Sequence, residues 1–190
     1  QGGFDDALLE RVATLPGVAL ASPVLELQTL ARRADGTRVP LRVLGVDALL
    51  IARIAPGLMP RPDEALAAGR ERLSVLLPDT AFLNATARAL RGDDERLTLQ
   101  AAGNWQALRV AGDVTAPGEA LAVMDVAAAQ ERFDQLGRLT RIDLRLAEGA
   151  DARAVRAGLA AIAGPGVLLA EPASAGERAS NLSRAYRVNL

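Results

Sequence analysis

Residues 121–146 read LAVMDVAAAQERFDQLGRLTRIDLRL, and this stretch decides the fold class. The apolar run at 121–124 predicts a short strand, and Asp125 is a typical N-cap for a helix after it. Gly137 suits the C-terminal end of that helix. Residues 141–146 alternate charged and apolar side chains, which predicts a strand with one buried face. The helix should bury the residues that recur at helical spacing, namely Val126, Ala129, Phe133 and Leu136.

Similar signals lie on both sides of this stretch. Asp151 predicts the start of a second helix, which the breaker Gly164-Pro165-Gly166 ends, and residues 167–170 read as a further strand. Near the N-terminus, Asp5 or Asp6 can cap another helix. The helix after Asp151 should turn four residues inward, namely Val155, Gly158, Leu159 and Ile162.

A long hairpin follows the first helix. Residues 18–32 read as extended, and Pro23 within them marks a strand edge or a bulge. Asp35-Gly36 is a hairpin turn signal. The return strand over 38–47 alternates apolar and polar residues, so we expect one buried and one solvent-exposed face.

The middle and the tail of the chain are less regular. Residues 48–72 are rich in Pro and Gly and predict a loop with a short helix, and 73–77 reads as a buried strand. Pro78-Asp79-Thr80 predicts a helix start, with two strands following within 97–110. The helix that starts at Pro78-Asp79-Thr80 should bury Leu83, Ala87 and Leu90. The tail, 174–190, reads as helical. Strands and helices thus alternate, and the fold class we expect is α+β.

The composition excludes several kinds of active site. The chain has no Cys and no His, and all 22 of its basic residues are Arg. Thiolate nucleophiles, imidazole bases, Schiff-base lysines and the Walker A lysine are therefore excluded. The net charge is −1, and acidic and basic residues are interspersed along the chain, so we expect no nucleic-acid partner. Carboxylate-pair chemistry is the main catalytic option left.

Asp125 and Asp143 are the candidates for such a pair. A glycosidase-like reaction needs two carboxyl groups within about 5–10 Å of each other. Asp125 is more simply a helix N-cap. Asp143 lies on the expected wet face of its strand, between Arg141 and Arg145, where exposed ion pairing accounts for it.

Four other motifs also have simple structural interpretations. Arg91-Gly92-Asp93 matches an adhesion motif but is explained as a helix end and a turn. Asp93-Asp94-Glu95 lacks the ligand spacing of a calcium loop, and Gly164-Pro165-Gly166 has Pro where phosphate binding needs an N–H. Trp105 could contact a partner or pack over a hairpin. We therefore assign no catalytic, cofactor-binding or metal-binding residue, and expect a protein that is not an enzyme and holds no cofactor.

A set of short segments, in order along the chain, resembles a known family. They are Ala21-Ser22-Pro23-Val24, Gly45-Val46-Asp47, the run from Val123 to Gln130, the run from Leu139 to Asp151, and the tail from Leu182 to Leu190. Together they resemble the extracytoplasmic core domain of MacB/FtsX-type ABC transporter permeases. In that family an "A-Q" helix is followed by a glycine and by an "I-x-x-I-x-V-x-L-x-x-G-x-D" strand and helix.

The resemblance implies a two-lobed α+β fold. Residues 1–47 and 119–190 would form a porter-like lobe that includes terminal stalk helices, and residues 48–118 would form an inserted, strand-rich, Sabre-like lobe. The N-terminal helix and a helix over 180–190 should lie side by side, as they would in a domain inserted between two membrane spans.

The resemblance also implies a function. Such a domain lies in the periplasm of a bacterial inner-membrane permease and couples cytoplasmic ATP hydrolysis to substrate handling or partner activation. Its partners would be a cytoplasmic ABC ATPase, a second permease half or subunit, and a periplasmic protein or lipid-linked substrate. Two alternatives stay open: a periplasmic module that binds a small ligand or lipid between the lobes, and, less favoured, a carboxylate-dependent hydrolase.

Overall fold

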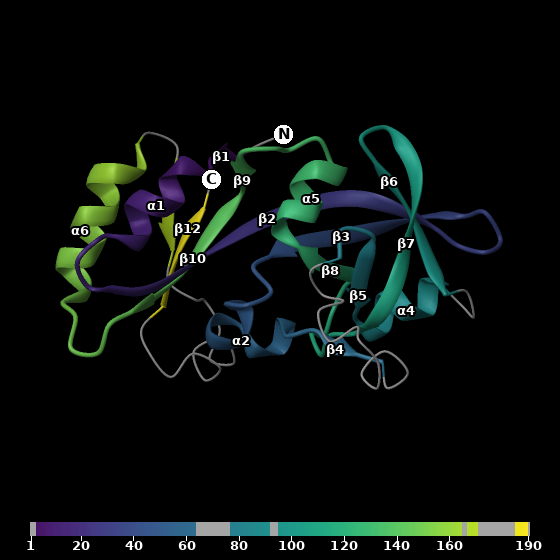
Figure 1. Cartoon of the computed structure of the whole chain (residues 1–190), viewed down its shortest axis with the longest axis horizontal. Helices are drawn as coiled ribbons and strands as arrows, with labels where there is room; N and C mark the ends of the chain where they lie inside the picture. Colours follow the sequence, from purple (N-terminus) through teal and green to yellow (C-terminus); the bar gives the residue numbers. More distant parts are fainter. Residues whose placement is uncertain (1–2, 64–76, 92–94, 165–166, 171–184, 190) are drawn as a thin grey trace.

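One long strand, β2, runs through most of the length of the molecule (Figure 1). The computed structural model describes residues 3–63, 77–91, 95–164, 167–170 and 185–189. Its elements are β1 (Phe4–Asp5), α1 (Ala7–Ala13), β2 (Val18–Arg32), β3 (Arg38–Val46), α2 (Ile51–Ile54), η1 (Pro56–Leu58), β4 (Arg61–Pro62), β5 (Thr80–Leu83), α4 (Ala85–Arg91), β6 (Arg96–Ala101), β7 (Asn104–Asp113), β8 (Leu121–Asp125), α5 (Val126–Arg132), β9 (Arg138–Leu139), β10 (Arg141–Leu146), α6 (Ala152–Ala163), β11 (Leu168–Ala170) and β12 (Ala185–Asn189).

The described strands form a ten-stranded mixed sheet and a small two-stranded one made of β1 and β9. The large sheet has the order β11-β12-β10-β2-β3-β8-β5-β7-β4, and β6 pairs with both β2 and β7. β3 pairs with β8 in parallel, and β5 pairs with β7 in parallel, whereas β2 is antiparallel to both β3 and β10. The structure therefore confirms a mixed α/β fold with a sheet-rich core.

Helices cover this sheet unevenly. At one end, α1 and α6 pack over β10 around Leu144 and Leu159. Further along, α5 packs against the face of β2 and β3 that carries Leu25, whereas Ile51 of α2 packs with Val24 on the opposite face. Gly45 of β3 lets α5 approach closely, because a Cβ there would lie 2.6 Å from the Cβ of Ala129. The core thus consists of one cluster at the α1–α6 end and two clusters on opposite faces of the other end.

Several local predictions are confirmed. The carboxylate of Asp125 accepts hydrogen bonds from the first turn of α5, and that of Asp151 does the same for α6. Asp35-Gly36 forms the β2–β3 turn, with Gly36 at φ +85°. The Thr37 hydroxyl donates to the Asp35 carboxylate at 2.5 Å, and this bond holds the pKa of Asp35 below its ordinary value of 3.8.

The prediction for residues 78–83 is wrong. Thr80–Leu83 form β5, a strand with all four residues buried, and the helix begins only at Ala85. Phe82 packs on one face of the sheet and Leu83 on the other. A strand buried on both faces shows no alternation of polar and apolar residues, which is why its pattern resembled a helix.

Two further helix predictions are wrong, one at the end of α5 and one in the tail. α5 ends at Arg132 rather than near Gly137, and Leu136 is 71% exposed instead of buried. In the tail, the expected helix is contradicted for Ala185–Asn189, which forms β12 between β10 and β11. The predicted strand at 73–77 lies, except for Leu77, outside the described residues, as do 180–184.

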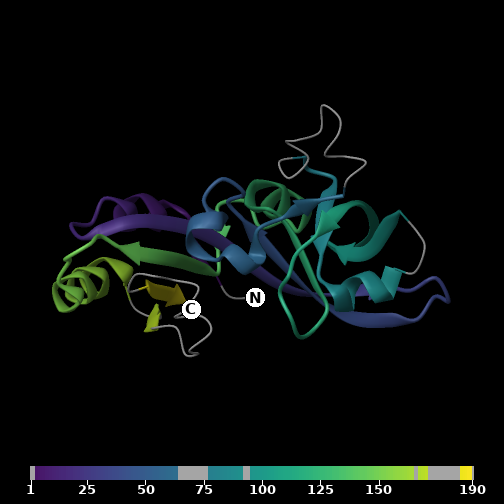
Figure 2. The same cartoon turned by 90° about the horizontal axis from the view of Figure 1, so that it is seen from below.

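The two described ends of the chain lie close together. Phe4 of β1 pairs with Leu139, and Asn189 of β12 pairs with Arg141, two residues further along. The marks for the N- and C-termini are accordingly near one another in both Figure 1 and Figure 2. The described helices include none with the length and apolar character that a membrane crossing requires.

The two-lobe division stays a prediction. The sheet runs without interruption from the segments assigned to one lobe into those assigned to the other, because β5 pairs with β8 and β6 with β2. One apolar cluster also contains residues of both parts, such as Leu41 and Leu99.

Candidate functional site

A surface groove lies beside the middle of β2, where β6 separates from it. It has a volume of about 620 Å³ and is widely open to solvent. Its walls come from β2, from Pro40 of β3, from the end of β6 with the turn after it, and from the segment after α5. The main lining side chains are uncharged: Leu27, Leu30 and Phe133 are apolar, and Gln28, Gln100 and Gln135 carry amides. The groove is thus lined by both apolar side chains and side-chain amides.

Two side chains connect the elements that carry the walls of the groove to their neighbours. Arg132, in the last turn of α5, donates from Nη1 to Gln106 Oε1 of β7 at 2.6 Å and from Nη2 to the Pro78 carbonyl at 2.9 Å. Across the groove, the Thr29 hydroxyl of β2 donates to the main-chain carbonyl of Gln100. The groove is therefore bounded by connected elements, which fixes its position in the fold.

Part of the edge of β2 has no strand beside it among the described residues. On one edge, β3 pairs with β2 from Val24 to Arg32. On the other edge, β10 pairs with β2 as far as Val24, and β6 pairs only with Ala31 and Arg32. The main chain between these two partners faces the groove. We call residues 26–30 on this side the open edge.

The ladder shows which main-chain groups point to the open edge. Arg33 N donates to Thr37 O at the hairpin, so odd-numbered residues of β2 bond to β3 and even-numbered residues point the other way. Glu26 N follows this rule, because it donates to the Thr140 hydroxyl at 2.7 Å. Pro40 of β3 lies opposite Leu30 and also fits this rule, because even-numbered residues of β2 do not bond to β3 and proline has no N–H to donate. The Gln28 N–H and C=O therefore point into the groove, and no described residue bonds to them there.

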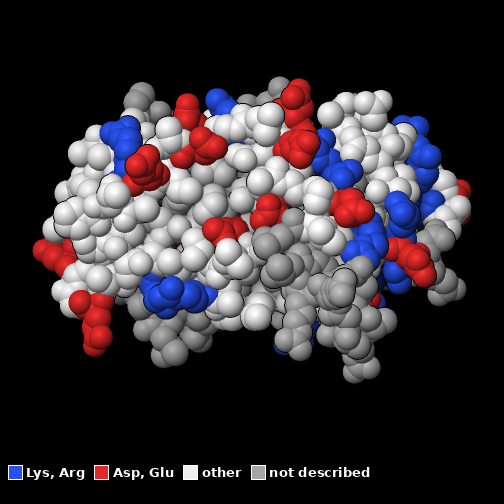
Figure 3. Space-filling model, viewed as in Figure 1, with Lys and Arg blue, Asp and Glu red and all other residues white. Residues whose placement is uncertain are grey.

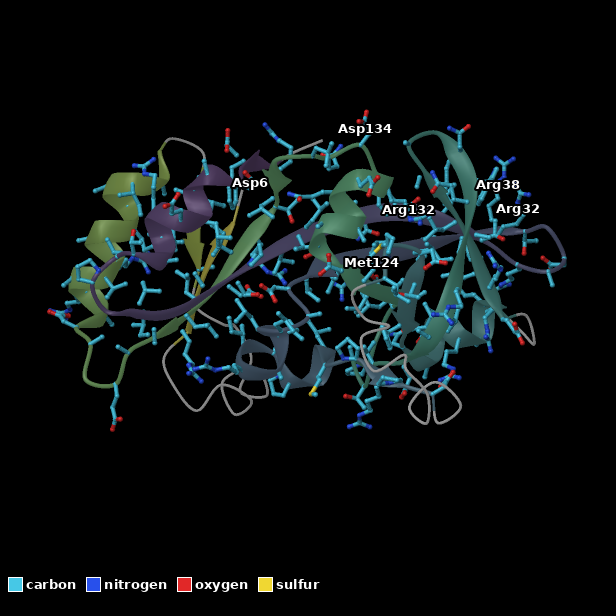
Figure 4. The ribbon with its side chains drawn as sticks, in the orientation of Figure 1. Asp6, Arg32, Arg38, Met124, Arg132 and Asp134 are labelled. Carbon is cyan, nitrogen blue, oxygen red and sulfur yellow. The ribbon has the colours of Figure 1, made fainter. Side chains whose placement is uncertain are left out.

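A stack of cationic and aromatic side chains borders the groove. The guanidinium of Arg32 lies 4.1 Å from the centroid of the Trp105 ring, and that of Arg38 lies 5.6 Å from it. Trp105 is cross-strand from Gln100, which lines the groove. Figure 4 shows Arg32 and Arg38 side by side on the β2–β3 hairpin. Trp105 therefore packs against the arginines of a neighbouring hairpin, and this contact is worth about 0.5–1 kcal/mol per pair at an exposed site.

An ion-pair cluster begins at Glu26, at one end of the open edge, and extends onto β10 and β3. Arg141 Nε donates to Asp143 at 2.9 Å, and its Nη1 donates to Glu26 at 2.8 Å. Arg42 lies 3.5 Å from the other oxygen of Glu26. Asp143 is only 5% exposed, so the expectation that it lies on a wet face is wrong. The opposite face of β10 is buried under the helices, and neighbouring parts of the fold cover Asp143 as well.

The structure does not bring Asp125 and Asp143 together. Asp143 pairs with Ser22 of β2, while Asp125 pairs with Val46 of β3 in the parallel β3–β8 ladder. Two strands thus separate β10 from β8, which at about 4.8 Å per strand places the two backbones about 14 Å apart. Asp125 is also engaged as the N-cap of α5. The pair is too far apart for glycosidase-like chemistry.

The other sequence candidates stay structural where they are described. Arg91 ends α4, and Gly164 follows α6 at φ +75° as its C-cap. The rest of the Arg91-Gly92-Asp93 and Gly164-Pro165-Gly166 motifs lies outside the described residues, as does most of Asp93-Asp94-Glu95. Within the described part of the chain, no group of three or more acidic residues is placed to hold a metal ion.

Sequence reasoning missed the groove and one structural side chain. Asn84 is 1% exposed and makes four hydrogen bonds: its Oδ1 accepts from Ala87 N and Leu121 N, and its Nδ2 donates to the Ala116 and Glu119 carbonyls. Its N-cap character, directly before the apolar face of α4, was a usable signal. The open edge of β2 had no sequence signal, because it depends on where β10 and β6 stop pairing.

Comparison with known proteins identifies the fold. No family model matches the sequence, and no curated protein matches it either. Solved structures do match. The extracellular domain of the noncanonic ABC-type transporter YknZ from Gram-positive bacteria aligns with a TM-score of 0.57 at 10% identity, over 82% of this chain and 78% of that one. The fold resembles that of an extracytoplasmic permease domain.

Two further structures agree. The periplasmic region of MacB from Actinobacillus actinomycetemcomitans aligns with a TM-score of 0.59 at 8% identity, covering 98% of this chain and 78% of its own. A domain of a permease protein from Porphyromonas gingivalis aligns at 0.50 and 15% identity, covering 100% and 78%. The resemblance to MacB/FtsX-type domains is thereby confirmed at the level of the fold.

Proposed function

We propose that this chain is the extracytoplasmic domain of an ABC transporter permease. The observation that carries the proposal is the fold, which it shares over most of its length with three domains of that kind. The adjacency of its described ends, both next to β9 and the start of β10, supports the same conclusion. A domain inserted between two membrane helices must leave and return at one side.

In this role the domain has no chemistry of its own to perform. A cytoplasmic ABC ATPase drives the membrane helices, and the domain transmits their movement to a periplasmic protein or lipid-linked substrate. It acts together with a second permease half or subunit. The two-lobe division at residues 47/48 and 118/119 belongs to this proposal. The separation of Asp125 from Asp143 favours it over the hydrolase alternative.

The location can be tested with cysteine labelling, because the chain contains no cysteine. Leu136→Cys, at an exposed position, is introduced into the full-length protein in its own host. We expect a membrane-impermeant maleimide to label it once the outer permeability barrier is opened and the inner membrane is intact. Ala87→Cys is the matched control, because Ala87 is fully buried and should stay unlabelled until denaturation. Labelling of Leu136→Cys only after lysis of the inner membrane would overturn the proposal.

The ATPase partner requires a separate measurement. The full-length protein, solubilised in mild detergent and purified by a tag, should retain a nucleotide-binding subunit with ATPase activity. Purification without such a subunit, from cells that express the neighbouring genes, would contradict the coupling.

A further inference from the structure

The open edge of β2 has the properties of a binding site for a polypeptide strand. The Gln28 N–H and C=O, the Glu26 C=O and the Leu30 N–H point away from β3 by the alternation of the ladder. Gln28 is exposed, and the groove gives its main chain access to solvent. Unpaired main-chain groups at the edge of a sheet are a template for another extended chain.

The ends of the open edge limit the length of the occupant. Thr140 closes one end by accepting a hydrogen bond from Glu26 N, and the Thr29–Gln100 bond with the β6 pairing closes the other. An extended chain rises about 3.3 Å per residue, so the space between them fits a segment of roughly four residues. Main-chain hydrogen bonds would supply affinity, and the apolar groove wall would accept alternate side chains.

The charge at the hairpin end of the groove favours an acidic side chain there. Arg32 and Arg38 are exposed. Arg32 follows Leu30 on β2, and Arg38 precedes Pro40 on β3, and both Leu30 and Pro40 line the groove. On the face shown in Figure 3, basic side chains gather at the end of the molecule that carries β6 and β7. Figures 1 and 2 both show the β2–β3 hairpin reaching beyond the neighbouring strands at that end. A carboxylate next to the docked segment would therefore meet two guanidinium groups.

We propose that this groove binds a short extended segment of another polypeptide, which adds a strand to the open edge of β2 at Gln28 and places an acidic side chain beside Arg32 and Arg38. The proposal rests on the geometry of the sheet and goes beyond the function proposed above. It can fail while the location test succeeds, and the reverse also holds.

The first experiment is a selection. A displayed library of random nine-residue peptides is selected on the 190-residue chain, and the tightest binder is synthesised. We expect an Asp or Glu in it, and at least tenfold slower hydrogen exchange of the Gln28 and Leu30 amides when it is bound. A library without a binder, or a binder that protects amides elsewhere, would overturn the proposal.

Matched variants test the strand-like contact. Gln28→Pro removes the N–H that points into the groove, and Gln28→Ala retains it. We expect the dissociation constant to rise at least tenfold for the first and to change less than twofold for the second. Arg32→Ala together with Arg38→Ala should weaken the acidic peptide severalfold and its amide analogue hardly at all. Equal binding by Gln28→Pro and Gln28→Ala would contradict the proposal.

A test on the peptide avoids any folding defect of Gln28→Pro. Alternate amides of a docked strand face β2, so N-methylation of one alternate set should abolish binding and methylation of the other set should not. Equal effects of both sets would refute strand addition. Competition by palmitate would assign the groove to a lipid instead. If the Gln28 amide became protected from hydrogen exchange as the protein concentration rose, without peptide, the groove would be assigned to a second copy of the chain.

Discussion

The two halves of β2 lie in different surroundings. Val18–Val24 pairs with β10 under α1 and α6, and we call this part of the molecule the helix-covered end. Leu25–Arg32 lies among β3, β5 to β8, α4 and α5, which we call the strand-rich end. In the helix-covered end, β10 pairs with the edge of β2 that is left open in the strand-rich end, and β3 pairs with the opposite edge only from Val24 onward. The partners of both edges of β2 thus change near Val24.

The ends also differ in how they are held together. At the helix-covered end, apolar packing around Leu159 is accompanied by the ion pair between Arg141 and the buried Asp143. At the strand-rich end, a buried polar side chain, Asn84, joins the start of α4 to the segment before β8. Loss of that side chain should therefore test the comparison most strongly.

Asn84→Leu should produce the largest effect. It removes four hydrogen bonds and leaves buried main-chain groups unpaired, each costing about 1–3 kcal/mol, so we expect a loss of about 4 kcal/mol. Urea unfolding followed by circular dichroism measures it. Asn104→Ala is the control, because Asn104 is exposed and its side chain makes one local bond to Ala102. A loss below 1 kcal/mol for Asn84→Leu would show that the strand-rich end does not depend on this side chain.

Cavity variants at the two ends should have the next largest effect. Leu159→Ala at the helix-covered end and Leu83→Ala at the strand-rich end each remove a fully buried side chain. We expect each to cost about 3 kcal/mol. Because β2 is continuous through both ends, both variants should still unfold in one cooperative thermal transition, seen by calorimetry. Two separate transitions would indicate that the ends are independent units.

The helix caps should have the smallest effect and should sharpen the comparison. Asp151→Ala removes the cap of α6 at the helix-covered end, and Asp125→Ala removes that of α5 at the strand-rich end. Each should cost about 1 kcal/mol in urea unfolding. Glu148→Ala, at an exposed position, should change stability by less than about 0.5 kcal/mol. An unchanged stability for Asp151→Ala would mean that packing alone positions α6.

The sequence predicted elements of both ends, but unequally. Strands whose charged or polar residues alternate with apolar ones, such as β10 and the first part of β3, were predicted from that alternation. β5 was not, because both of its faces are buried and its four residues carry no period. β12 was predicted as a helix, because its partners β10 and β11 both lie more than ten residues before it in the sequence and leave no local signal of the pairing.

The candidate site shows the same limit. Asp125 was correctly understood as a cap, because capping is a local interaction. Asp143 was expected to be exposed but is buried, because its burial depends on what covers that face of β10 rather than on the residues beside it. The groove could not be predicted at all, because its walls come from four segments that only the fold brings together.

By itself, the sequence determined the caps of α5 and α6, the Asp35-Gly36 hairpin, the fold class and the absence of Cys, His and Lys chemistry. These depend on residues within a turn or two of one another, or on composition alone. Only the tertiary structure decided that β5 is a strand, that Asp143 is buried and that Gln28 faces an open edge. Each of these depends on which distant strands pair, and where the pairing ends.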